Sequence, residues 1–100
     1  MTHSTISTEE ENAGSLDVVY HTIDITSLDS AGTEQYDPES ETNLSGADVR
    51  GVSVRGTETN THLVRWDHTT EEFHVQDVAD GTDTANNTNV GEVVLEIVGA

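Results

Sequence analysis

The chain of 100 residues carries a formal net charge of −17, because it has no lysine and only three arginines beside 20 acidic residues. This composition argues against direct binding to nucleic acid or to an anionic membrane, since both depend on lysine and arginine. The absence of cysteine excludes disulfides, thiolate metal sites and thiol nucleophiles. The length suffices for one domain with one hydrophobic core.

The acidic residues are spread along the whole chain rather than gathered in a tail. Successive blocks of ten residues each contain between one and four of them. This distribution indicates a surface adapted to concentrated salt, where the Debye length falls to about 3 Å at 1 M and solvent cations screen the carboxylates. A decoy that imitates nucleic acid would also be acidic, but it has no special reason to lack lysine.

The first segment, Met1–Ser15, has one sizeable aliphatic residue after the initiator, Ile6, among polar residues. Such a composition does not offset the entropy of ordering a backbone, which predicts a flexible arm. Glu9–Glu11 could begin a helical turn, but no apolar residue follows at helical spacing. The segment lacks the pattern of a signal peptide and no run is long enough to span a membrane, so we expect a cytoplasmic protein.

Short strands are predicted from Leu16 onward, because valine, isoleucine, threonine and aromatic residues dominate the apolar runs and no window has helical spacing. The first strand is Leu16–Thr26. One face of this strand holds Val19, His21, Ile23 and Ile25 and the other holds Val18 and Tyr20, a doubled pattern that indicates burial on both sides near its start. A long loop over Ser30–Ser45 follows, since it contains Gly32, the pair Asp37-Pro38 and many small polar residues.

The second strand, Val49–Thr57, is expected to point Val52 and Val54 inward. Two glycines within it, Gly51 and Gly56, indicate a bulge or a close backbone approach.

The clearest local unit is a hairpin within His62–Asp80, where two alternating segments flank a polar interval of hairpin length. Its shared apolar face is expected to consist of Val64, Trp66, Phe73 and Val75. After a second long connection, Val90–Gly99 forms the last strand, with Val93, Leu95 and Ile97 on its buried side. These segments predict an all-β domain over residues 16–100, a five- or six-stranded sandwich or barrel preceded by the flexible arm of residues 1–15.

Two groups of side chains are candidate metal ligands. The histidines are His62, His68 and His74. The third lies on the opposite face by parity, so a shared site needs a bulge or a bent loop. The aspartates are Asp77, Asp80 and Asp83. They miss the register of a calcium loop, because aligning Gly81 places Val78 at a ligand position. Neither group has a ligand-spacing signature, so we expect diffuse association with solvent cations, no specific metal and no cofactor.

No motif in the chain supports catalysis. A nucleophile elbow, a phosphate-binding loop and a dinucleotide fingerprint are all missing from the sequence. A domain of this size also offers little volume for a deep pocket. We therefore expect no catalytic residues and a protein that is not an enzyme.

The three arginines are the distinctive residues of a generic acidic surface. Arg50 and Arg55 border the second strand, and Arg65 neighbours Trp66. Each is expected to pair with a carboxylate or to stack on an aromatic ring. The alternative is an arginine patch at an interface with a protein partner.

The segments follow one another in a suggestive order. A strand ending in Asp24-Ile25-Thr26 is followed by Leu44-Ser45-Gly46, the strand Gly51-Val52-Ser53-Val54, the hairpin from Val64-Arg65-Trp66-Asp67 to Phe73-His74-Val75, and a closing strand. This order resembles the small β-rich structural proteins that decorate the heads or build the tails of tailed viruses and proviruses. The resemblance implies that the hairpin is a packing element and that no catalytic residue carries over. The missing lysines depart from the pattern, as in a version from a salt-loving archaeon.

These observations predict a structural or protein-interaction domain of a halophile, derived from a virion component. Its edge strands and N-terminal arm would contact copies of itself or a larger assembly, by strand addition or by ordering on contact. The alternative function is a small ligand- or metal-binding module.

Overall fold

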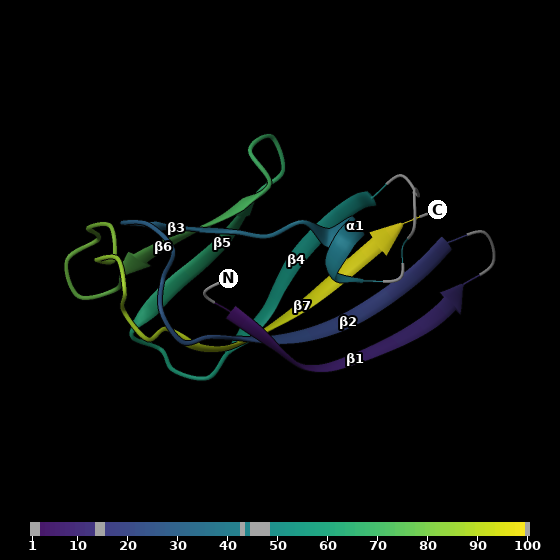
Figure 1. Cartoon of the computed structure of the whole chain (residues 1–100), viewed down its shortest axis with the longest axis horizontal. Coiled ribbons are helices and arrows are strands. Elements are labelled where there is room, and N and C mark those ends of the chain that lie inside the picture. Colours follow the sequence, from purple (N-terminus) through teal and green to yellow (C-terminus); the bar gives the residue numbers. More distant parts are fainter. Residues whose placement is uncertain (1–2, 14–15, 43, 45–48, 100) are drawn as a thin grey trace.

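The computed structural model describes residues 3–13, 16–42, 44 and 49–99. Along the chain, its elements are β1 (His3–Ala13), β2 (Leu16–Ile25), β3 (Thr33–Gln35), α1 (Pro38–Glu41), β4 (Val49–Thr57), β5 (His62–Asp67), β6 (Glu72–Asp77) and β7 (Gly91–Gly99). The strands form a large sheet in the order β1-β2-β7-β4 and a small sheet in the order β3-β6-β5 (Figure 1). The all-β prediction is confirmed. The described residues hold seven strands rather than five or six, and neither sheet closes into a barrel.

The centre of the large sheet follows from strict alternation in β2 and β7. Leu95 lies opposite His21, with Val93 opposite Ile23 on the same face. Val93, Leu95 and Ile97 of β7 are buried as predicted. Of the two faces predicted for β2, the one with Val19, His21, Ile23 and Ile25 is buried, whereas Val18 and Tyr20 on the other face are only half-buried. Because successive side chains of a strand point to opposite faces, the alternation places the buried residues of both strands on one side of the sheet.

The small sheet contributes the other wall of the core. Val64 pairs with Val75, and Trp66 pairs with Phe73, which confirms the shared apolar face of the predicted hairpin. The side chains of Phe73 and Val75 are fully buried, and Trp66 is partly buried against them. One hydrophobic cluster therefore joins the two sheets.

Strand β4 contains the bulges that its glycines indicated. Its register with β7 shifts between Val49 and Gly51 and again between Val54 and Gly56, so Arg50 and Arg55 are the extra residues. The first shift brings Val49 onto the same face as Val54, which a regular strand would not do. A side chain at either glycine would meet nothing within 4 Å among the described residues, so no close approach explains them.

The N-terminal segment is the largest departure from the sequence prediction. His3–Ala13, expected as a flexible arm, form strand β1, which pairs with β2 along almost its whole length. Backbone groups make this ladder whatever the side chains are, so a low apolar content does not prevent it. The remaining residues of the predicted arm, 1–2 and 14–15, lie outside the described part of the chain.

The predicted loop Ser30–Ser45 also contains regular structure. It holds β3 and the four-residue helix α1, whose first turn begins at Pro38 and is capped by the Asp37 side chain, which accepts from the Glu39 N–H. An Asp-Pro pair is a favourable start for a helix, so the turn residues noted in the sequence serve here as a cap. Residues 43 and 45–48 of this loop lie outside the described part.

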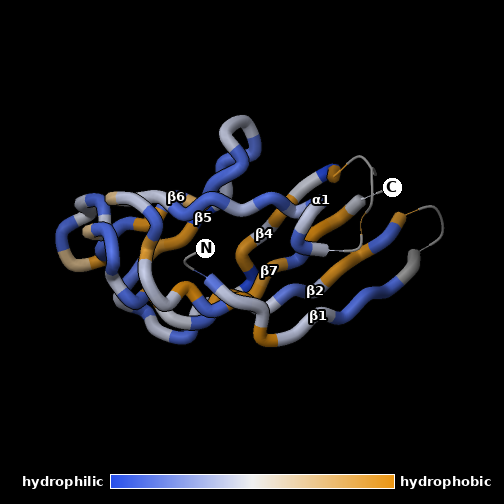
Figure 2. Tube along the Cα trace, viewed as in Figure 1, coloured by the Kyte–Doolittle hydropathy of each residue, from blue (hydrophilic) through white to orange (hydrophobic). Residues whose placement is uncertain are grey.

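The hydropathy of the strands differs between the border strand β1 and the other strands of the large sheet. In Figure 2, β2, β4 and β7 carry apolar stretches, whereas β1 is mostly polar and borders the sheet. Among the described residues, no helix is long and apolar enough to cross a membrane.

Candidate functional site

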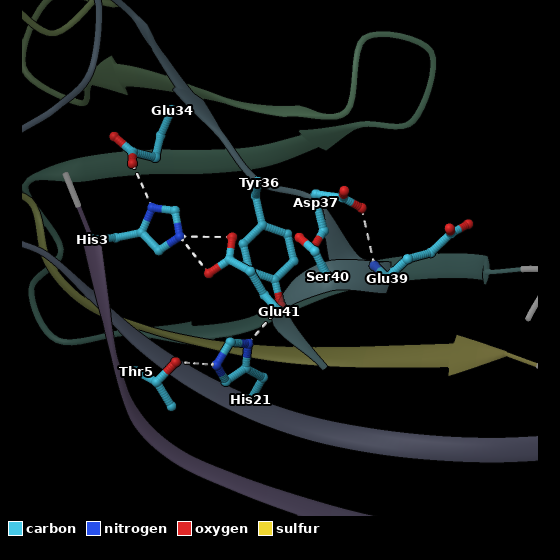
Figure 3. A network of polar contacts seen from close by, with 9 residues as sticks. All are labelled: His3, Thr5, His21, Glu34, Tyr36, Asp37, Glu39, Ser40 and Glu41. Atoms are coloured by element: carbon cyan, nitrogen blue, oxygen red, sulfur yellow. Dashed lines mark hydrogen bonds and ion pairs between the residues drawn. The ribbon is translucent and has the colours of Figure 1, made fainter. Parts of the chain in front are cut away.

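Six polar side chains meet between the two sheets, and we call them the polar cluster (Figure 3). They are His3, Thr5, His21, Glu34, Tyr36 and Glu41. Strands β1, β2 and β3, the residue after β3 and helix α1 each supply at least one of them. The cluster thus ties the N-terminal strand to both the small sheet and the helix.

His3 is held between two carboxylates. Its Nδ1 lies 2.5 Å from Glu34 Oε2, and its Nε2 lies 2.7 and 2.9 Å from the two oxygens of Glu41. Both ring nitrogens donate to these acceptors only when the ring is protonated, so this geometry is that of an imidazolium. Glu34 also accepts the N–H of Asp29 through its other oxygen, at 2.9 Å.

The protonation of His3 agrees with its surroundings. Burial alone would lower the pKa of His3, but the hydrogen bonds that His3 donates to Glu34 and Glu41, together with the negative charges of these carboxylates, raise that pKa to about 9. The His3 side chain is 1 % exposed, as is that of Glu34, while that of Glu41 is 15 % exposed. A charged histidine is therefore buried and compensated by two carboxylates rather than one.

His21 is the neutral counterpart of His3. Burial lowers the pKa of His21, and Glu41 opposes this shift while the charge of His3 adds to it. Tyr36 Oη lies 2.5 Å from His21 Nδ1, and Thr5 Oγ1 lies 2.9 Å from His21 Nε2. Since burial raises the pKa of Tyr36, its hydroxyl keeps its proton and donates to Nδ1, so Nε2–H donates to Thr5.

Tyr36 links the polar cluster to the aromatic part of the core. Its ring centroid lies 5.3 Å from that of Phe73 and 6.0 Å from that of Trp66, the latter in an edge-on arrangement. It also lies 5.8 Å from the ring of His3 and 5.7 Å from that of His21. One side chain therefore contacts apolar rings while its hydroxyl fixes the tautomer of a buried histidine.

The polar cluster fixes charges and orientations inside the protein. Within the described ranges, every buried side-chain nitrogen and oxygen has a hydrogen-bond partner, and no pocket is found. This arrangement anchors β1, because His3, the first described residue of that strand, is held between the carboxylates of Glu34 and Glu41.

The second candidate site is the outer edge of β1, the side of that strand away from β2, which we call the β1 edge. Strand β1 is the last strand on its side of the large sheet. Its side chains from Ser4 to Glu11 are all exposed. The register with β2 shifts once, at Ile6, and is regular from Ser7 onward. An exposed edge of this kind presents backbone N–H and C=O groups to a partner strand.

The three candidate histidines for metal binding are dispersed by the hairpin. His62 begins β5 and His68 directly follows its last residue, so about 20 Å of extended strand separates them. Nε2 of His62 lies 3.5 Å from Oδ1 of Asp77, and Nε2 of His74 lies 3.0 Å from Oδ2 of Asp67. His68 accepts the indole N–H of Trp66 at 3.1 Å.

The three candidate aspartates stabilise turns and loops. Asp77 accepts the Thr84 hydroxyl at 2.7 Å. Asp80 accepts the N–H and hydroxyl of Thr82, and these bonds lower the pKa of Asp80. Asp83 packs against Gly32, and a Cβ added at Gly32 would lie 2.7 Å from Cγ of Asp83. No group of three or more metal-ligating side chains occurs in the described residues.

The arginines divide between the two sheets. Arg50 and Arg55 are both on β4, whereas Arg65 is on β5. Arg55 lies 3.5 Å from Glu96, and its side chain is 58 % exposed, so this ion pair with a surface carboxylate contributes little to stability. As the sequence indicated, Arg50 and Arg55 lie on one strand and Arg65 lies on another.

The sequence interpretation missed the polar cluster. The alternation of β2 places His21 on one face with Val19, Ile23 and Ile25, but nothing in the sequence indicates that a polar partner lies above it. His3 and Glu34 lie in polar segments, where the residue types do not distinguish buried positions from exposed ones. The useful signal was the alternation of β2, since a histidine on an apolar face requires hydrogen-bond partners from another element.

Comparison of the chain with protein-family models, with curated proteins and with solved structures finds no match.

Proposed function

We propose that this protein is a non-enzymatic structural or protein-interaction domain, which joins an assembly by adding a strand of a partner to the β1 edge. The observation that carries the proposal is the 11-residue length of β1, an exposed strand at the border of the large sheet. Soluble proteins usually keep edge strands short, bulged, covered or strongly charged. β1 has one bulge, at Ile6, and three exposed glutamates, Glu9–Glu11, but its regular part from Ser7 onward is long enough to receive another strand of suitable charge.

The side chains of β1 indicate the chemistry of the partner. Glu9, Glu10 and Glu11 follow one another in its regular part and are exposed. Like charges directly opposite in a sheet are destabilising, whereas opposite charges are favourable. The β1 edge therefore favours an extended partner segment with arginine or lysine. Ile6, which is 52 % exposed, adds an apolar contact near the start of the strand.

The composition and the strand order support the wider context of the proposal. A charge of −17 suits an assembly that forms in concentrated salt. The resemblance to small β-rich virion proteins, which rests on segment order, suits a domain whose role is to hold copies together. We therefore include assembly in concentrated salt and a virion-like role in the proposed function.

The test is a titration with a strand-length peptide of alternating valine, threonine and arginine, followed by amide resonances in roughly 0.5 M and 2 M KCl. We expect chemical-shift changes and slower amide exchange in residues 7–11. A control peptide with proline at every second position lacks the donors of a ladder and should have no effect. Binding of both peptides alike, or no change at β1 with either, contradicts the proposed function.

A further inference from the structure

We infer that the partner strand is β4 of a second copy, so that copies of this chain join head to tail through the two edges of the large sheet. This inference rests on the proposed function and names its partner. The two edges are β1 and β4, since the strand order is β1-β2-β7-β4. We call the outer side of β4 the β4 edge.

The direction of the strands permits this contact. All three pairs in the large sheet are antiparallel, so β1 and β4, which are three strands apart, run in opposite directions. A second copy placed beside the first in the same orientation brings its β4 next to β1 with antiparallel polarity. The alternation of directions then continues across the contact without interruption.

The charges of the two edges favour a contact of β1 with β4 over a contact of β1 with another β1. A contact between two β1 edges would oppose Glu9–Glu11 of one copy to the same residues of the other. On the β4 edge, the exposed charged side chains are Arg50 and Arg55. Opposite charges therefore meet only in the head-to-tail arrangement, and like charges meet in the two symmetric ones.

The bulges define where the ladder can form. Gly51–Val54 pair regularly with β7 between the two register shifts, and on β1 the regular part begins at Ser7. Bulges at edges restrict pairing, so the shared ladder is limited to about four residues. The arginines lie at both ends of this segment.

Such a contact uses two different surfaces of each copy, so it is heterologous. A heterologous contact repeats on every added copy and generates a ring when the rotation closes or a filament when it does not. The expected product is therefore a closed ring or an open series, rather than a two-fold dimer.

Cysteine cross-linking tests this arrangement, because the natural chain has no cysteine. Glu9, Tyr20, Glu96 and Ser53 form one row across the large sheet. Glu9 and Ser53 are therefore three strand spacings apart, about 14 Å, which is too far for a disulfide within one copy. The variant Glu9→Cys is mixed with the variant Ser53→Cys and treated with a short bismaleimide, whose spacer tolerates a small difference in register but does not bridge the distance of about 14 Å between the two sites of one copy.

We expect heterodimers of the two variants to exceed both homodimers, and the double variant to form a series of linked oligomers. The control pair is Glu9→Cys with Leu63→Cys, since Leu63 is 55 % exposed but lies on β5 of the small sheet. Equal cross-linking of the control pair, or a majority of Glu9→Cys homodimers, overturns the inference.

Sedimentation in roughly 0.5 M and 2 M KCl gives an independent measurement. Reversal of both arginines, Arg50→Glu with Arg55→Glu, is expected to weaken association about tenfold, because it places like charges at the contact. Adding Glu9→Arg and Glu11→Arg to that variant should restore association. Equal association of all three proteins, or a chain that stays monomeric, overturns the inference.

These outcomes separate the inference from the proposed function. A monomeric chain whose β1 still binds the basic strand peptide contradicts the second copy as partner and leaves strand addition in place. Homodimers linked through Glu9→Cys also contradict the head-to-tail contact and leave strand addition to β1 in place. A peptide that does not bind β1, together with cross-linking of the Leu63→Cys control pair equal to that of the Ser53→Cys pair, assigns the assembly to other surfaces and contradicts both.

Discussion

The core between the two sheets has an apolar part and a polar part, which are held together by different interactions. The apolar part includes Leu95, Ile97, Phe73 and Val75, all fully buried. The polar part is the cluster around His3 and His21, in which every contact is directional. Apolar packing depends on volume and tolerates rearrangement, whereas a buried polar network depends on each partner being present. The difference predicts how each part responds to substitution and to pH.

The largest effect is expected from truncation in the apolar part. Leu95→Ala removes a fully buried side chain from the central strand β7 and should lower the free energy of unfolding by about 2 to 5 kcal/mol. The control is Val94→Ala, since Val94 is 37 % exposed on the opposite face of the same strand. Urea unfolding in constant molar salt measures both. Equal losses for the two variants would contradict the assignment of faces.

The polar part should respond to pH where the apolar part does not. His3 has a folded pKa of about 9 against 6.5 for the unfolded value, so its contribution is complete below pH 6.5 and is lost as the pH rises through 9. The shift corresponds to a loss of up to about 3 kcal/mol. The lowered pKa of His21 acts below pH 6.5 and does not disturb this window.

Urea unfolding between pH 6.5 and 9 measures the loss, and His3→Gln is the control because it has no charge to lose. The stability of the variant should change much less over this range. A slope that is the same in both proteins would show that His3 is not the group responsible.

A smaller loss is expected from one hydroxyl group. Tyr36→Phe keeps the aromatic contacts with Phe73 and Trp66 but leaves Nδ1 of His21 without its donor. An unsatisfied buried polar atom costs about 1 to 3 kcal/mol. Tyr20→Phe is the matched control, because the Tyr20 hydroxyl bonds to Glu96 on the outer face, where water can take its place, so its effect should stay within about 0.5 kcal/mol. Calorimetric unfolding of both variants measures the difference, and equal effects would contradict a specific role of the hydroxyl group.

The smallest effect concerns the helix that carries Glu41 into the polar part. Asp37→Ala removes the cap of α1 and should lower the free energy of unfolding by about 1 kcal/mol. Glu39→Gln, one exposed change within the same turn, keeps the cap and should be close to neutral. Chemical denaturation of the two variants compares them, and a neutral Asp37→Ala would contradict the capping role.

The apolar part could be predicted from the sequence, and the polar part could not. Alternation identified the buried faces of β2 and β7, and Gly51 and Gly56 marked the bulges of β4. By contrast, β1 forms through backbone pairing with β2, which side-chain composition does not encode. The partners of His3 lie 31 and 38 residues further along the chain. A contact over that distance depends on the fold as a whole, so no local pattern reveals it.

The position of β7 in the large sheet has a consequence for how the protein is made. β7 lies between β2 and β4, yet it follows both in the chain and is separated from β2 by the whole small sheet. During synthesis, β2 and β4 therefore have no partner between them until residues 91–99 leave the ribosome. Long-range pairing of this kind folds slowly and leaves strand edges open in the meantime. Among the described strands, β7, one of the two central strands of the large sheet, is thus the last to be synthesised, and completion of that sheet waits for it.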